Sequence, residues 1–428
     1  MEMIQWKHLN RLSEVNSNQG IKFLHRAAAP GSHCPMHTAL AALLRIEGVS
    51  SLVVGMAECG YYSRYVMNTP YGKQGELHYV YELDSNEVVF GCREGVKKAI
   101  KLMDKEGAKI IMMIITCIPA LIGEDAKAII TELEEEITAK VLYVDAAHFK
   151  RNGYMSGYYQ TLVQLADVLN DNSEKPEKTI NLLGPSDSEE LIMLKDIISK
   201  NHIAINEIDG NLSIEKLNKV TGGTINIVLT NKMLKYAKRI KEKFGIPFIC
   251  LHDIYDVDEI SAAYEKIFKA LEIPSEIRYN KEFNAYKNEV ISLIEQYKPA
   301  FENISYICAS AELDVLPMSV YLSTLGIKPI LLHIEEFDED SIPWRDKLTA
   351  RGMDPYVTYI TDKSRNVDFD MEASMADKDI LSFGYYKGLK SVSIISDKDI
   401  NAMISLNGYQ RTMLLLKLII QCINQKQY

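Results

Sequence analysis

The chain has 428 residues, of which 47% are hydrophobic and 25% charged, which is the composition of a globular protein with more than one domain. Its net charge of -10 argues against a nucleic-acid partner, because phosphate binding needs a clustered basic surface. No stretch approaches the roughly 20 consecutive apolar residues of a membrane span, so we expect no membrane association.

Cysteine usage indicates the compartment. The chain has seven cysteines, an odd number at low density, which is typical of a reducing environment and not of a disulfide scaffold. The N-terminal segment MEMIQWKHLNRLSE is polar and mixed in charge, unlike a secretory signal. We therefore expect a cytoplasmic protein in which cysteine is core filler, nucleophile or metal ligand.

From residue 26 onward, short apolar runs alternate with helix-period segments, a pattern typical of βα units around parallel sheets. The predicted strands form three series, which are 51–56, 87–91, 109–116 and 139–146, then 178–185, 203–208, 225–230 and 246–251, then 304–310, 328–334, 355–361, 379–384 and 391–396. Charged helical stretches near 147–177 and 258–300 separate the series. The pattern predicts an α/β protein of three Rossmann-like domains, each a mainly parallel sheet flanked by helices, over residues 1–172, 173–298 and 299–428.

Three cysteines of the first series fall at predicted helix starts. Cys59 and Cys117 follow strands, and Cys34 precedes a proline that suits the first turn of a helix. Ligands of open parallel sheets bind outside the carboxyl ends of the strands. Helix starts there supply free N–H groups and about half a positive charge, which favour thiolate. We call Cys34, Cys59 and Cys117 the rim cysteines.

A lone cysteine is more often a small buried hydrophobe than a ligand. We expect this of Cys250 and Cys308, which lie inside predicted strands, and of Cys422, which lies in a predicted amphipathic helix. The rim cysteines are harder to dismiss, since they share one edge. The sequence has no CxxC pair, which argues against a structural zinc site or a ferredoxin-type cluster. Three soft thiolates favour iron–sulfur over magnesium or calcium.

A cubane cluster needs four ligands, so the rim cysteines leave one to be found. Cys92 also follows an apolar run and starts a predicted helix, so it could be that ligand. A partner subunit could supply the ligand instead, and Cys92 would then be a tolerated small residue. The sequence leaves these alternatives open.

A family resemblance rests on five motifs in order, HCPMHTALAALL, VVGMAECGYYSRY, EVVFGCREGVKKAI, ITCIPALIGED and TINLLGP. Together they resemble the component 1 superfamily of nitrogenases, which includes molybdenum-iron protein subunits, cofactor-assembly scaffolds and tetrapyrrole reductases. The resemblance implies that the rim cysteines hold an iron–sulfur cluster, expected to be [4Fe-4S], at a subunit interface. The partner there would be a homologous component 1 subunit or a second copy of this chain.

The resemblance also implies a redox partner. In that family the phenylalanine of the VFG motif lies where an ATP-dependent reductase docks, and Phe90 takes that place here; its alternative is an ordinary strand-end core residue. Where the family commonly has a second glycine, this chain has Cys92. The chain has no GxxxxGK[ST] phosphate loop, so the reductase, a dimeric iron–sulfur ATPase, would be a separate protein.

Departures from the family limit the cofactor. The residue that matches the cofactor-ligating cysteine of the molybdenum-iron α subunit is Thr230, and the segment SVSIISDKDINAMISLNGYQ lacks the expected histidine. We therefore expect no iron-molybdenum-type cofactor. His33 and His37 flank Cys34 and could relay protons or be ordinary interface residues.

The predicted function is that of an oxidoreductase subunit which passes electrons from the ATPase to a small-molecule substrate. The alternative is a non-catalytic scaffold that holds a metallocluster or cofactor precursor for transfer. The sequence identifies no catalytic residue.

Overall fold

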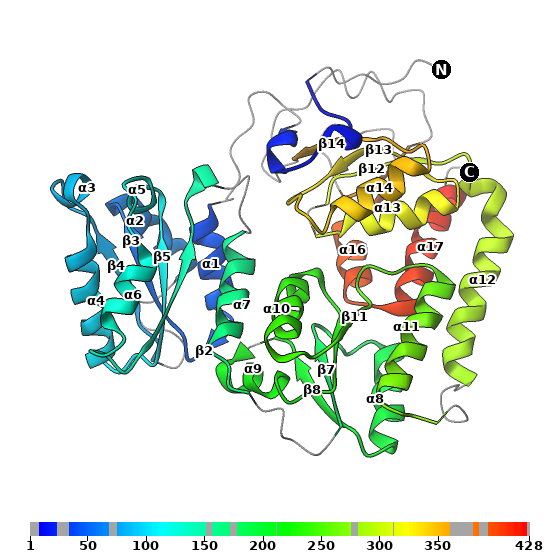
Figure 1. The fold of residues 1–428 in the computed structure, drawn as a ribbon. Coiled ribbons are helices and arrows are strands. Elements are labelled where there is room, and N and C mark those ends of the chain that lie inside the picture. Colours follow the sequence, from blue (N-terminus) through cyan, green and yellow to red (C-terminus); the bar gives the residue numbers. More distant parts are fainter. Residues whose placement is uncertain are drawn as a thin grey trace. The chain divides into compact units, whose positions relative to one another are not determined.

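The computed structural model describes residues 8–23, 34–67, 75–150, 156–171, 178–210, 212–274, 281–310, 312–359, 380–384 and 393–425 (Figure 1). The chain divides into two compact units, one of residues 1–31, 185–203 and 249–428 and one of residues 32–184 and 204–248. We call them unit 1 and unit 2 and describe each by itself.

The first sheet, in unit 2, has the strand order β4-β3-β5-β6, and all its pairings are parallel. Its strands are β3 (Ser50–Gly55), β4 (His78–Glu82), β5 (Ile110–Ile115) and β6 (Lys140–Asp145). The surrounding helices are α1 (Pro35–Leu43), α2 (Ala57–Val66), α3 (Glu87–Phe90), α4 (Arg93–Lys105), α5 (Cys117–Leu121), α6 (Ala126–Leu133), η3 (His148–Lys150) and α7 (Gly157–Asp167).

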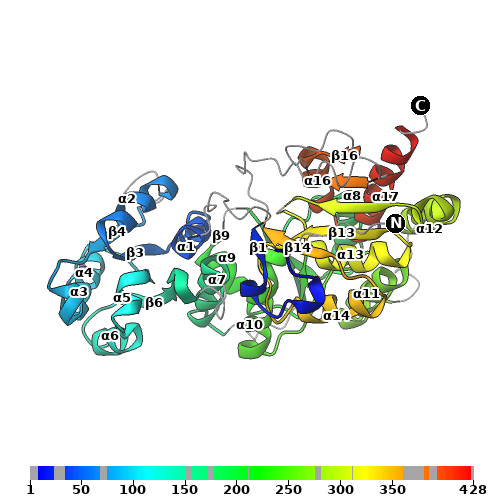
Figure 2. The ribbon, with the colours of Figure 1, turned by 90° about the horizontal axis from the view of Figure 1, so that it is seen from above.

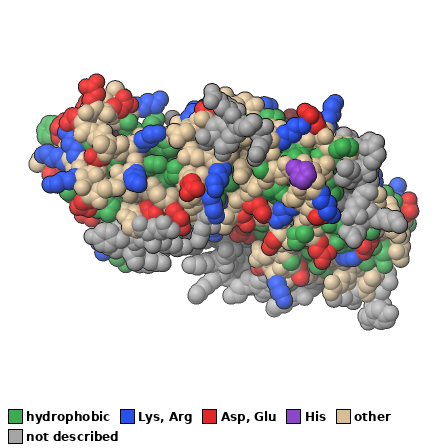
Figure 3. Space-filling model, turned by 90° about the horizontal axis from the view of Figure 1, so that it is seen from below, with side chains coloured by type: hydrophobic (Ala, Val, Ile, Leu, Met, Phe, Trp, Pro, Cys, Tyr) green, Lys and Arg blue, Asp and Glu red, His purple; other side chains and the backbone are tan. Residues whose placement is uncertain are grey.

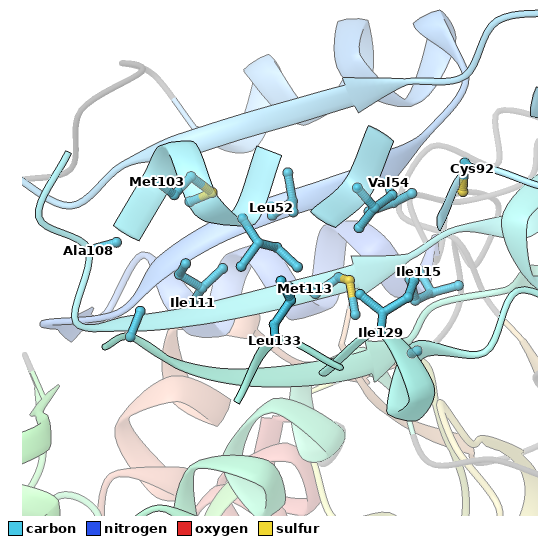
Figure 4. Packing of buried hydrophobic residues seen from close by; sticks show 14 of the residues in the cluster. Leu52, Val54, Cys92, Met103, Ala108, Ile111, Met113, Ile115, Ile129 and Leu133 are labelled. Atoms are coloured by element: carbon cyan, nitrogen blue, oxygen red, sulfur yellow. The ribbon is translucent and has the colours of Figure 1, made fainter. Parts of the chain in front are cut away.

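Strand β5 is apolar throughout because helices cover both faces of the sheet. Ile111, Met113 and Ile115 enter a hydrophobic cluster that β3 and the helices α4 and α6 complete, and Figure 4 draws part of it. Since side chains of a strand alternate between faces, the residues between them point to the opposite face. Fixing both faces of β3 and β5 holds the loops at their carboxyl ends in place.

The predicted strand at 87–91 is wrong: residues 87–90 form the helix α3. The Asp84 carboxylate accepts from the backbone N–H groups of Asn86 and Glu87 at 2.8 and 2.9 Å, and the Glu87 carboxylate accepts from the N–H of Asp84 at 3.1 Å. This reciprocal capping box stabilises a helical turn against the β-preference of the two valines. On the side of the sheet away from β5, β3 pairs with β4, which lies upstream of residue 87 and was not predicted.

The second sheet, also centred in unit 2, has the order β11-β10-β7-β8. Its strands are β7 (Thr179–Leu183), β8 (Ala204–Ile208), β10 (Ile225–Val228) and β11 (Phe248–Cys250), with α9 (Ile214–Val220), η4 (Asn231–Met233) and α10 (Leu234–Phe244) between them. A short pair, β2 (Ile46–Glu47) and β9 (Leu212–Ser213), joins the chain near the first sheet to this one. Arg239 of α10 pairs with Asp167 of α7 at 2.6 Å.

The third sheet, in unit 1, has the order β1-β14-β13-β12-β15-β16 with parallel pairings, and Figure 2 shows β1 beside β14. Its strands are β1 (Lys22–Phe23), β12 (Ser305–Cys308), β13 (Lys328–His333), β14 (Tyr356–Tyr359), β15 (Ile380–Phe383) and β16 (Ser393–Ile395). The helical segments of unit 1 are η1 (Leu12–Glu14), η2 (Asn18–Gly20), α8 (Glu189–Lys200), α11 (Val257–Ala270), α12 (Lys281–Phe301), α13 (Val315–Thr324), α14 (Ile342–Ala350), α16 (Asp397–Ile404) and α17 (Gly408–Gln425).

The predicted fold class, α/β with parallel sheets flanked by helices, is confirmed. The boundaries 1–172, 173–298 and 299–428 stay a prediction. Within the described ranges no helix combines the length and the hydropathy needed to cross a bilayer. On the face drawn in Figure 3, lysine and arginine side chains are interspersed with aspartate and glutamate.

Candidate metal centre

The first sheet changes winding direction between β3 and β5. From β3 the chain adds β4 on one side, and it then crosses to add β5 and β6 on the other. Such a switch point leaves a crevice outside the carboxyl ends of the two central strands, where α/β proteins bind ligands. Two of the rim cysteines follow these two strands: Cys59 lies in the first turn of α2, and Cys117 is the first residue of α5.

Cys34 is the N-cap residue of α1, with Pro35 at the first helical position. Helix α1 packs against α7, and the close approach depends on Gly157, where a Cβ would lie 1.9 Å from the carbonyl oxygen of Pro35. The first turn of α1 is therefore held in position by its packing against α7. This packing sets the position of the Cys34 side chain.

Cys59 lies against the end of β5. Its thiol donates to Oγ1 of Thr116 at 3.5 Å, and the Thr116 hydroxyl in turn donates to the carbonyl oxygen of Val54 at 2.8 Å. Gly55 makes this packing possible, because a Cβ there would lie 2.3 Å from Oγ1 of Thr116 and 3.0 Å from Sγ of Cys59. The glycine in VVGM is thus a spatial requirement of the Cys59 position.

Cys117 receives a backbone hydrogen bond from the segment that follows β6. The N–H of His148 donates to Sγ of Cys117 at 3.3 Å. His148 belongs to η3, so three successive strand ends of the sheet contribute to the surroundings of the thiols. The sequence analysis missed His148, and nothing in its residue type would have indicated a main-chain donor.

The three rim cysteines are electrostatically coupled. Burial raises the pKa of the Cys34 thiol, the N–H groups of Met36 and His37 at the start of α1 lower it, and the charges of Cys117 and Cys59 raise it further. The mutual repulsion of thiolates is what a bound cation or metal cluster relieves.

The donor set suits an iron–sulfur group. Thiolates are the usual ligands of such clusters, and backbone N–H donors near the sulfurs adjust the cluster potential. Cys34, Cys59 and Cys117 would hold the group, and the N–H of His148 would donate to the Cys117 sulfur. Three ligands from one chain leave room for ligands from another.

Cys92 has different surroundings. It is 1% exposed and belongs to the hydrophobic cluster of the first sheet, as Figure 4 shows. Its N–H and its thiol both donate to Oε2 of Glu124, at 2.8 and 3.5 Å. Burial, followed by the charge of Glu124, raises the pKa of this thiol to about 12. These contacts favour the interpretation of Cys92 as a small buried residue and not as the missing ligand.

Phe90 is 85% exposed, and Val89 beside it is 70% exposed. The alternative that Phe90 is an ordinary core residue is therefore wrong. Cys250, which we expected to be a small buried hydrophobe, is the last residue of β11 and is partly exposed, so that expectation is wrong; Cys308 and Cys422 are buried as expected.

Thr230 is the N-cap residue of η4 at the end of β10, and its methyl group would lie 2.8 Å from a Cβ at Gly184. His33 lies outside the described residues. The His37 ring makes an edge contact with Tyr62, with ring centroids 6.3 Å apart. Burial, followed by the charge of His148, lowers the pKa of His37, and a backbone hydrogen bond at Tyr62 opposes this effect.

Comparisons with known proteins show the family of the chain. A family model described as nitrogenase component 1 type oxidoreductase matches residues 34–400. The nitrogenase iron-molybdenum cofactor biosynthesis protein NifE of Clostridium pasteurianum is 22% identical over 280 residues, which cover 63% of this chain and 60% of that protein. The nitrogenase molybdenum-iron protein alpha chain of Methanothermobacter marburgensis is 24% identical over 223 residues, 47% of each chain.

Among solved structures, nitrogenase Cp1 at pH 6.5 shares the fold with a TM-score of 0.63 at 17% identity, over 95% of both chains. In the sequence comparisons this chain spans less than two thirds of the length of the relatives it matches. The family model nevertheless covers most of the chain, including all three rim cysteines. The chain therefore belongs to the nitrogenase component 1 type oxidoreductase family.

Proposed function

We propose that this chain is the cluster-carrying subunit of a nitrogenase-like reductase. In this proposal the rim cysteines hold a [4Fe-4S] cluster, which when bound supplies one-electron transfer. The chain accepts electrons from a separate ATP-dependent reductase and delivers them to a small-molecule substrate. The observation that supports the proposal is that Cys59 and Cys117 follow the two central strands of the first sheet, at its switch point, and that the charges of both act on Cys34.

Exposed apolar side chains at the same edge of the sheet support a subunit interface there. Tyr61 and Tyr62 on α2, Leu121 on α5 and Phe149 on η3 are each more than half exposed. Each belongs to an element that follows a strand of the first sheet. Because soluble monomers rarely expose many large apolar residues in one region, we expect a homologous subunit or a second copy to cover them. That partner would supply the remaining cluster ligands.

Phe90 and Val89 support the docking of a reductase. Both lie on α3, after β4, and project from a short helix that the Asp84–Glu87 capping box stabilises. An exposed aromatic side chain on a rigid element is the usual form of an interface hot spot. The expected partner is a dimeric iron–sulfur ATPase. We expect the complex in the cytoplasm, because its thiolate ligands must stay reduced.

The sequence lacks the ligands of an iron-molybdenum-type cofactor, which limits the reactions that this chain could catalyse. Thr230 offers a neutral hydroxyl where a thiolate would be needed to hold an iron-molybdenum-type cofactor. The substrate would therefore take its electrons without such a cofactor on this chain.

The experiment is a set of three single substitutions in protein purified without oxygen. Cys34→Ala, Cys59→Ala and Cys117→Ala are each expected to lose bound iron and the brown absorbance of the wild-type protein. Cys308→Ala is the matched control, because Cys308 is buried in β12 and should keep full iron content. Full iron in all three rim variants would refute the proposal.

A second candidate function is favoured by the relatives. The first four relatives by sequence are cofactor biosynthesis proteins named NifE, so a scaffold that holds a cluster or precursor for transfer is the alternative. Substrate reduction that requires the ATPase and reductant supports the reductase. Loss of the iron to an acceptor protein, without turnover, supports the scaffold.

A further inference from the structure

A second group of metal-ligating side chains lies in unit 1, where β11 ends. Sγ of Cys250, a ring nitrogen of His252 and a carboxylate oxygen of Asp253 all lie within 4.8 Å of one another. Cys250 is the last residue of β11, and the other two belong to the turn that follows. Thiolate, imidazole and carboxylate are together the ligand types of Zn²⁺, and three such ligands leave one coordination position open.

The turn is held in place by a buried arginine. Arg411 of α17 donates to the carbonyl oxygens of Leu251 at 2.8 Å and Ile254 at 2.7 Å, and also to that of His252. Its guanidinium stacks on Tyr255, 4.1 Å from the ring centroid. Since these bonds fix the backbone on both sides of the turn, the three ligand atoms converge without a folding step at the moment of binding.

A fourth side chain orients the histidine. Oδ2 of Asp314, at the start of α13, lies 3.8 Å from Nε2 of His252. A carboxylate against the imidazole of a metal-bound histidine fixes the ring and raises its basicity as a ligand. The side chain of His252 is only 4% exposed, so its ring is held in one place.

The formal charges of the group balance with a divalent cation. When they are ionised, the Cys250 thiol and the carboxyl groups of Asp253 and Asp314 carry three negative charges, and Arg411 carries one positive charge. The guanidinium bonds described above go to carbonyl oxygens and not to the two carboxylates. A bound divalent cation would bring the sum to zero, which lowers the cost of burying the group.

The group can be reached from solvent. Asp253 lines a pocket of about 450 Å³ in unit 1, together with Tyr255, Tyr321 and Trp344. An ion can enter by this route after the chain has folded.

We propose that Cys250, His252 and Asp253 form a binding site for a zinc-type divalent cation, with Asp314 as the positioning residue for His252. The site lies outside the rim cysteines and does not depend on the proposed redox function. Its fourth ligand is a water molecule or a group that enters from the pocket.

The test uses cobalt(II) as a spectroscopic substitute for zinc. The full chain carrying Cys34→Ala, Cys59→Ala and Cys117→Ala, which removes the rim thiols, is titrated with Co²⁺ alone. We expect one equivalent to bind with a thiolate-to-cobalt charge-transfer band. Adding Cys250→Ser should abolish that band, and Asp253→Asn or His252→Gln should weaken binding by more than about tenfold. Asp314→Asn should weaken it by about 10- to 100-fold while the band remains.

Two matched controls separate ligation from general damage. Cys422→Ala removes a buried thiol on α17, and Asp256→Asn removes a carboxylate charge from the same pocket; both should leave the band unchanged. In the protein with its rim cysteines intact, Zn²⁺ should raise the thermal midpoint, and Cys250→Ser should remove that rise. No band in the triple variant together with no zinc-dependent midpoint, or a band that survives Cys250→Ser, would overturn the proposal.

Discussion

Cys59 and Thr116 meet across the β3–β5 strand pair, with Sγ 3.5 Å from Oγ1, and this contact joins the loops at the carboxyl ends of the two central strands. Because Thr116 is hydrogen-bonded to the backbone of β3, the Cys59 thiol is positioned by the sheet itself. A metal bound by Cys59 would therefore be held in a fixed position relative to the sheet.

Gly55→Ala tests that arrangement. The added methyl carbon would lie 2.3 Å from Oγ1 of Thr116, so the hydroxyl and the Cys59 thiol must move apart. We expect the variant to fold with a loss of about 1–3 kcal/mol in the free energy of unfolding, the usual cost of overpacking, and to lose most of its bound iron. Iron content and urea unfolding measure the two effects.

Gly20→Ala is the matched control, because it lies in unit 1 and the atoms nearest to its added Cβ would be those of Val15, at 3.3 Å. It should keep the wild-type iron content. If Gly55→Ala also retained full iron, the contact between Cys59 and Thr116 would have no role in the centre.

The central strands β3 and β5 could be predicted from sequence because they are buried on both faces. The runs at 51–56, 109–116 and 139–146 are apolar without interruption or nearly so, and each became a strand. The run at 87–91 is also mostly apolar, but the segment DSNE, residues 84–87, precedes its valines. Its Asp84–Glu87 capping box makes the backbone helical there. Alternation in HYVYE, residues 78–82, was the signal for β4.

The positions of the rim cysteines at helix starts could be predicted, because they follow from local signals along the chain: Pro35 after Cys34, and an apolar run before each of Cys59 and Cys117. The electrostatic interaction between the rim cysteines could not be predicted. It depends on β3 and β5 being neighbours in the sheet, which results from the crossover of the chain between β4 and β5. The ligand group at Cys250 lies within four consecutive residues, CLHD, yet no local pattern indicates the turn that folds them together. That turn depends on Arg411, which is 159 positions away from His252.

Cys92→Ala separates a buried thiol from a ligand. Since burial and Glu124 raise the pKa of Cys92 to about 12, its thiol stays protonated at neutral pH and should not bind iron. We expect full iron content and a loss of about 1 kcal/mol in the free energy of unfolding, because the side chain lies in the hydrophobic cluster. Loss of iron in a variant that unfolds like the wild type would make Cys92 a ligand after all.

Phe90→Ser tests the docking surface. The side chain is 85% exposed, so the free energy of unfolding should change by less than about 0.5 kcal/mol. Reduction of the chain by its ATPase should slow by about tenfold or more, as for an interface hot spot, whereas reduction by dithionite should keep its rate. Leu102→Ser on α4, also exposed, is the control and should leave both rates unchanged. Equal reduction by the ATPase in Phe90→Ser would assign docking elsewhere.

Glu190 of α8 joins that helix to the start of α17. Its carboxylate accepts from the N–H groups of Tyr409 and Gln410 at 3.0 and 2.7 Å and from the Tyr264 hydroxyl at 2.6 Å. Gly408 is required beside it, because a Cβ there would lie 2.2 Å from Oε1 of Glu190. Burial outweighs these donors and raises the pKa of Glu190 to about 7.

The raised pKa of Glu190 predicts how stability depends on pH. A carboxyl whose pKa is higher in the folded state holds its proton more tightly there, so its contribution is fully favourable below its ordinary pKa and is lost as pH rises from about 4.5 to about 7. A tenfold difference in proton affinity between the folded and unfolded states corresponds to about 1.4 kcal/mol. The free energy of unfolding of the wild type should therefore fall over this window relative to that of Glu190→Gln.

Urea unfolding at several pH values measures the difference between the two proteins. The control is Glu189→Gln, which changes the exposed neighbouring carboxylate and should follow the wild type. Parallel pH curves for the wild type and Glu190→Gln would show that the three hydrogen bonds, and not burial, determine the charge of Glu190.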